Sequence, residues 1–140
     1  MKASALYRIA GVLLIVFAAG NTYGVSRFRQ LSESMNRVHF RVGHSGFTYA
    51  QFVVALELFC SLCLLFAAYL AWHLAALART TPQAIGALGW VLFAYEIVGL
   101  YISWIFFSGF VLVLSAGIAI CTGRATWLVQ SAPPALAAAK

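Results

Sequence analysis

Two glutamates within long apolar stretches are the residues best suited to do chemistry. Glu57 lies in residues 47–77 and Glu96 in residues 84–107, and neither stretch contains a second charged residue. An ionisable side chain at the middle of a bilayer is costly, so it is treated as a functional-site hypothesis by default. Because two carboxyl groups in a dry site do not both ionise readily, we expect at least one of them to be protonated at neutral pH.

The helical faces around these acids indicate where they point. Glu57 shares a face with Ser61 and other small residues, and Glu96 shares a face with Ser103 and other small residues. Small residues allow close helix packing in membranes. Each acid lies roughly 15–18 Å into its stretch at 1.5 Å per residue. We therefore predict that Glu57 and Glu96 form one buried polar site supported by Ser61 and Ser103.

This site has a purely structural alternative. A protonated glutamate that donates to a serine or to a backbone carbonyl of the next helix would only hold helices together. Asn21 and Tyr101 extend the hypothesis, because they could line a polar mouth above the carboxyl groups. In the structural alternative, Asn21 ends its helix and meets lipid head groups.

Other chemistry-bearing residues give weaker signals. Cys60 and Cys63 form a C-x-x-C motif, but both are expected near mid-bilayer, where cysteine packs as a small hydrophobic residue. A helix would rise roughly 40 Å from His44 to His73, so these two cannot ligate one ion. We predict no metal site and no cofactor.

The composition defines the elements that must position these residues. Of 140 residues, 64% are hydrophobic and 9% are charged, whereas a soluble domain has about 25% charged residues. This excludes a soluble enzyme, a disordered chain and a disulfide-stapled module. Since about 20 apolar residues cross a bilayer, we predict an all-α, single-domain, four-helix transmembrane bundle. The expected spans are residues 6–23, 47–77, 84–107 and 110–128.

The connections complete this prediction. The last two apolar stretches are nearly continuous, and Ser108-Gly109 is the turn-like pair at which the chain must fold back. Between the first two spans, apolar residues recur at spacings of three and four, which indicates a short interfacial amphipathic helix over residues 31–42. The Ala/Pro-rich residues 131–140 are expected to form a flexible tail.

The net charge of +6 suggests contact with anionic lipid head groups rather than with nucleic acid. Five basic residues fall on the side of the termini and four on the other side, so the positive-inside rule only weakly favours cytoplasmic termini. This near-balance would also suit a protein that inserts in both orientations. A cleaved signal peptide ending near Ala18-Ala19-Gly20 is a further alternative for the first span.

The stretch KASALYRIAGVLLIVFAAGNTYG, followed by NRVHF, resembles a family of small uncharacterised bacterial membrane proteins with four spans. The resemblance implies a multi-pass protein of the bacterial inner membrane and assigns no catalytic residues. Relatives often carry histidine where this chain has Asn21, which argues against a metal or proton-relay role at that position.

Three functions fit these features. The first is a bundle that binds a lipophilic ligand, such as a lipid or quinone, or serves as an accessory subunit beside a partner membrane protein or a second copy. The second is a proton-coupled exporter of hydrophobic cations working as an inverted dimer. The third is an enzyme that uses Glu57 and Glu96 for acid-base chemistry on a membrane-soluble substrate, such as an isomerisation or cyclisation.

Overall fold

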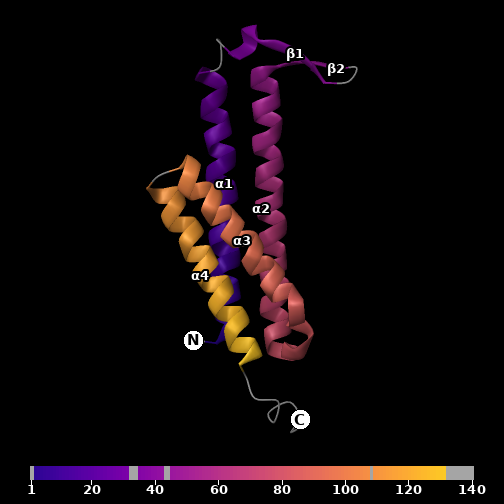
Figure 1. Cartoon of the computed structure of the whole chain (residues 1–140), viewed down its shortest axis with the longest axis vertical. Coiled ribbons are helices and arrows are strands. Elements are labelled where there is room, and N and C mark those ends of the chain that lie inside the picture. Colours follow the sequence, from indigo (N-terminus) through magenta and orange to yellow (C-terminus); the bar gives the residue numbers. More distant parts are fainter. Residues whose placement is uncertain (1, 32–34, 43–44, 108, 132–140) are drawn as a thin grey trace. The chain divides into compact units, whose positions relative to one another are not determined.

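The computed structural model describes residues 2–31, 35–42, 45–107 and 109–131, with the side chains of residues 26–31, 40 and 42 outside the description. Within these ranges the chain is all-α, with four long helices and one small β-hairpin (Figure 1). The helices are α1 (Ala3–Leu31), α2 (Tyr49–Thr80), α3 (Gly86–Phe106) and α4 (Phe110–Gln130).

Each of the four helices contains a stretch long and apolar enough to cross a membrane. All four predicted spans coincide with a helix, so the prediction of a multi-pass, four-helix architecture is confirmed. The predicted tail over residues 131–140 lies almost wholly outside the described residues.

The chain divides into two compact units, which are described separately below. The first unit contains Met1–Leu14 and Ala67–Lys140, and therefore includes α3 and α4 with the ends of α1 and α2. The second unit is Ile15–Phe66, which holds the remaining parts of α1 and α2 and the β-hairpin between them.

In the first unit, α3 and α4 pack as an antiparallel pair because small residues let the helices approach closely (Figure 1). A Cβ added to Gly123 would lie 2.6 Å from the Phe93 ring, so this ring occupies the space that a side chain would take. Near the other end of the pair, the buried Ser103 and Ser115 hydroxyls form a 2.9 Å hydrogen bond. The turn uses Gly109 with a φ of 65°, close to the predicted fold-back, while Ser108 lies outside the described residues.

The start of α1 is held in the first unit by polar contacts. Tyr7 is fully buried, and its hydroxyl lies 2.8 Å from the Thr126 hydroxyl of α4. Arg79 at the end of α2 donates from Nε to Ser4 Oγ at 2.8 Å. Tyr7 near a span end is typical of an interfacial aromatic residue, but here it is a core residue because its hydroxyl finds a buried partner.

The Tyr7–Thr126 hydrogen bond is expected to stabilise the first unit modestly. Tyr7→Phe should lower the free energy of unfolding by about 0.5–1 kcal/mol, since Thr126 keeps its bond to the Thr122 carbonyl. The measurement is reversible unfolding in mixed micelles. Tyr101→Phe, at a position 65% exposed, is the matched control and should leave stability unchanged. Equal effects of the two variants would contradict this role for the hydrogen bond.

The segment between α1 and α2 differs from the prediction. The interfacial helix expected over residues 31–42 is wrong: α1 extends to Leu31, a 3-10 turn follows at Met35–Arg37, and His39–Val42 forms strand β1. This strand pairs antiparallel with β2 (Ser45–Thr48), with Phe40 opposite Phe47. The physical reason is that residues 38–42 alternate between apolar and polar types, which is the period of a strand rather than a helix.

Candidate functional site

Glu96 lies in the interior of the first unit. It is the eleventh of the 21 residues of α3, so it lies at the middle of a helix about 31 Å long. Its side chain is only 6% exposed, and Oε1 has no hydrogen-bond partner within the described residues. Leaving a buried polar group unsatisfied costs about 1–3 kcal/mol. The bundle therefore holds an acid at mid-helix that packing alone does not require.

Contacts between α3 and α4 are present on both sides of Glu96 along the helix. The Phe93 ring lies against Gly123 on one side, and the Ser103–Ser115 hydrogen bond lies on the other. On the face predicted for Glu96, Gly89 and Ser103 are buried with the acid, whereas Gly99 and Phe107 are exposed. However, Ser103 is seven residues away, about 10 Å along the helix, and its hydroxyl is bonded to Ser115.

In the second unit, the Asn21 side chain of α1 forms two hydrogen bonds to α2. Its Nδ2 donates to the backbone carbonyl of Glu57 and to Ser61 Oγ, each at 3.0 Å. Thr22 Oγ1 lies 2.9 Å from the Ala18 carbonyl and 3.1 Å from Ser61 Oγ. Ser61 is buried, so Asn21 and Thr22 converge on one serine within the apolar part of the helix pair.

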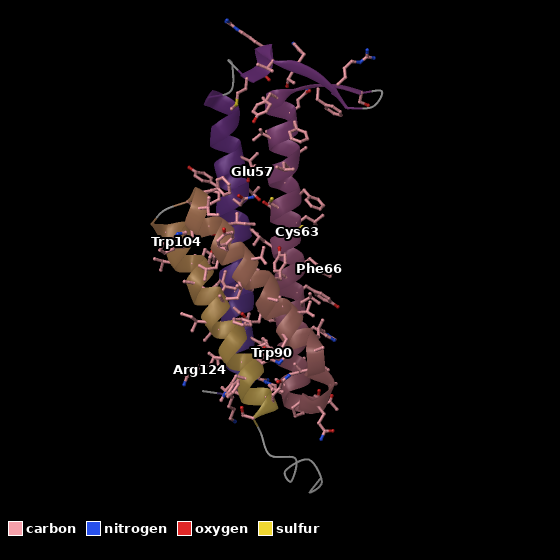
Figure 2. All side chains as sticks on the ribbon, in the orientation of Figure 1. Glu57, Cys63, Phe66, Trp90, Trp104 and Arg124 are labelled. Atoms are coloured by element: carbon pink, nitrogen blue, oxygen red, sulfur yellow. The ribbon has the colours of Figure 1, made fainter. Side chains whose placement is uncertain are left out.

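Glu57 is placed on α2 beside this cluster, eight residues after Tyr49 and thus about 12 Å along the helix. The side chain is partly exposed within the unit, unlike that of Glu96. Figure 2 labels Glu57, Cys63 and Phe66 in succession along α2. One helical turn beyond Glu57, Cys60 is an exposed free thiol. The second unit therefore presents a carboxyl group at a partly open, otherwise apolar surface.

The predicted site residues thus fall into two sets. Asn21, Ser61 and the backbone carbonyl of Glu57 come together in the second unit. Glu96 and Ser103 share a buried face of the first unit, where Tyr101 is exposed on α3. Because Glu57 and Glu96 belong to different units, a site shared by the two acids stays a prediction.

Two partners were missed by reasoning from the sequence. Ser115 follows Gly109 by six residues and Ser103 precedes it by six, so a fold-back centred on Gly109 would have placed the serines opposite each other. Thr126 is 119 residues from Tyr7, and the sequence contains no signal for that pair.

No protein-family model, curated protein or solved structure matches the chain. The geometry of the two units is therefore the basis for a functional proposal.

Proposed function

We propose that this is an integral membrane protein that binds a lipophilic molecule through a hydrogen-bond-donating polar group. The observation that supports this proposal is the bonding of Asn21 to both the Glu57 carbonyl and Ser61. These bonds occupy both N–H groups of the amide, so the group that Asn21 offers to a ligand is its oxygen, an acceptor. The Glu57 carboxyl group on the same helix pair adds further acceptor oxygens.

The surrounding surface favours a lipophilic ligand. Val53, Cys60 and Leu64 share the Glu57 face of α2, and all are apolar and at least partly exposed. The apolar tail of a ligand could lie along this face, where it would replace the lipid chains that otherwise contact the helix. The polar end would place a hydroxyl or amine hydrogen on the acceptors. A quinol, a hydroxylated lipid and a lipophilic amine share this chemistry.

An accessible carboxyl group in an apolar environment also explains why a ligand would bind here rather than elsewhere on the helices. An unpaired carboxyl group in hydrocarbon is unfavourable, and a bound donor offsets part of that cost.

We assign the protein to the inner membrane of a bacterium, with both termini in the cytoplasm. A partner membrane subunit that supplies the donor from a transmembrane helix would use the same acceptors.

The test is equilibrium binding of decylubiquinol and of decylamine to the full chain in mild detergent micelles. We expect Glu57→Gln to weaken binding of the preferred probe roughly tenfold, since a charge-assisted hydrogen bond is worth about 1.5–3 kcal/mol. Asn21→Leu should weaken it as well, through loss of the amide oxygen and of the bonds that order Ser61.

Glu96→Gln makes the same chemical change in the other unit. Unchanged binding is expected if the acceptor site at Glu57 is sufficient for the ligand, and a loss as large as that caused by Glu57→Gln would contradict this. Failure of both probes to bind the unmodified chain, or binding unaffected by Glu57→Gln, would overturn the proposal.

A further inference from the structure

Polar side chains lie in layers along the packed faces of α3 and α4 in the first unit. In one layer, the Tyr7 hydroxyl of α1 lies 2.8 Å from the Thr126 hydroxyl, and a Cβ added to Gly89 of α3 would lie 3.0 Å from Thr126 Oγ1. In another layer, the hydroxyl oxygens of Ser103 and Ser115 lie 2.9 Å apart. Each of these two outer layers joins hydroxyl groups of neighbouring helices directly.

Glu96 and Thr122 lie between the outer layers, on the same helical faces. On α3, Glu96 is seven residues from the residue of each outer layer, and seven residues return to nearly the same face of a helix. On α4, Thr122 is seven residues from Ser115 and four from Thr126. Because the helices are antiparallel (Figure 1), one step of about 10 Å leads from the serine pair to Glu96 on one helix and to Thr122 on the other. We call these two residues the middle layer.

The middle layer presents acceptor oxygens and no hydrogen to join them. Glu96 is 6% exposed and Thr122 is fully buried. The Thr122 hydroxyl directs its one hydrogen to its own helix, where the Ile118 and Ala119 carbonyls lie at 3.0 and 3.1 Å, so its oxygen offers only lone pairs. An ionised carboxyl group also only accepts, and Oε1 of Glu96 has no partner among the described residues. The group that this layer lacks is therefore positively charged or carries a hydrogen.

The charge and the chemistry of the oxygens favour a small monovalent cation. One carboxylate is neutralised by a single positive charge, whereas a divalent ion would leave a net charge in the interior, which is costly. Carboxylate and hydroxyl oxygens are ligands of hard cations rather than of zinc or copper. Because α3 and α4 approach closely at Gly89 and Gly123, sodium suits the layer better than the larger potassium ion.

We propose that the middle layer binds one sodium ion through Oε1 of Glu96 and Oγ1 of Thr122. The outer layers hold the helices together on both sides of the ion, and the ion supplies the positive charge that the two oxygens lack. This proposal replaces the prediction of no metal site, which was based on histidine and cysteine ligands. It goes beyond the binding of a lipophilic molecule and does not depend on it.

The experiment is equilibrium dialysis of the full chain against radioactive sodium in dodecyl maltoside micelles. Choline chloride keeps the ionic strength constant, and a buffer at about pH 8.5 favours the ionised carboxylate. We expect the unmodified chain to retain one sodium ion. Glu96→Gln keeps the shape of the side chain but removes its charge, so it should lower the affinity at least roughly tenfold. The unfolding midpoint of the unmodified chain should rise with sodium, and that of Glu96→Gln should not.

Substitution of Thr122 tests the second ligand. Thr122→Val removes the hydroxyl oxygen at constant shape and should weaken sodium binding, whereas Thr122→Ser keeps the oxygen and should retain it. Thr80→Val is the matched control, because the Thr80 hydroxyl also donates to the carbonyl four residues earlier, at 3.3 Å, but on an exposed part of α2 in the same unit. This control should bind sodium as the unmodified chain does.

Four results would overturn the proposal. If the unmodified chain retains no sodium, a protonated Glu96 that donates to Thr122 accounts for the layer instead. Equal retention by Glu96→Gln would place any bound sodium elsewhere in the chain. Equal weakening by Thr122→Val and Thr80→Val would remove Thr122 from the site. Displacement of sodium by an equal concentration of calcium would contradict the assignment to a monovalent ion.

Discussion

Replacing Gly123 with leucine is expected to destabilise the first unit by about 2–3 kcal/mol. A Cβ at this position would lie 2.6 Å from Cε2 and 2.9 Å from Cδ2 of Phe93, closer than real side chains approach each other. Displacing the Phe93 ring would also disturb its edge-on packing against Trp90, whose ring centroid lies 5.8 Å away. The substitution should therefore separate α3 from α4 along the face that also contains Glu96.

Gly99→Leu is the matched control for this prediction. Gly99 lies on α3, in the same helix pair, but a Cβ there would meet nothing within 4 Å. We expect its effect to be below about 0.5 kcal/mol, as for other surface substitutions. Unfolding in mixed micelles, followed by circular dichroism, measures both variants.

A second variant separates overpacking from a general intolerance of leucine in α4. Phe93→Ala empties the space that a leucine at position 123 needs. The variant with both changes should therefore be clearly more stable than the sum of the two single effects predicts. If it is no more stable than that sum, the close approach of Phe93 to Gly123 is not the cause of the destabilisation.

The four spans were predictable because their signal is local. A stretch of about 20 apolar residues has few alternatives to a membrane helix, and each predicted span coincides with a helix. The interfacial helix was wrong because spacing of three and four and spacing of two compete in a short segment. Val38 and Val42 fit both periods, and the pairing of Phe40 with Phe47 decides the outcome through contacts outside the segment.

The candidate site was predictable only in part. Helical periodicity correctly grouped the buried residues Glu96 and Ser103, but it also grouped Gly99 with them, which is exposed. It could not identify the partners of Ser61, because these depend on how α1 and α2 are aligned with each other, whereas the partner of Ser103 follows from the position of the turn at Gly109. Asn21 and Ser61 are 40 residues apart in the sequence, yet they are hydrogen-bonded in the structure.

Among the described residues, Oε1 of the buried Glu96 has no hydrogen-bond partner. Glu96→Leu should therefore raise the stability of the first unit by about 1–2 kcal/mol, because it replaces a buried polar group with one unsatisfied oxygen by an apolar side chain of similar size. A residue retained for packing would show the opposite effect. Glu96→Lys should instead lower stability by about 3 kcal/mol or more, since it introduces a buried cation with no counter-ion.

Unfolding of these two variants distinguishes the roles of Glu96 that the sequence left open. In the structural alternative, a protonated Glu96 donates a hydrogen bond that holds α3 to a neighbouring helix, and Glu96→Leu must then destabilise the unit. Ser115→Ala is an internal reference, because it removes a hydrogen bond that is present in the same helix pair and should lower stability by about 0.5–1 kcal/mol. A loss from Glu96→Leu as large as that from Ser115→Ala would contradict the prediction. A gain would mean that the bundle tolerates an acid at its centre at the expense of stability, which is the behaviour expected of a residue that serves function.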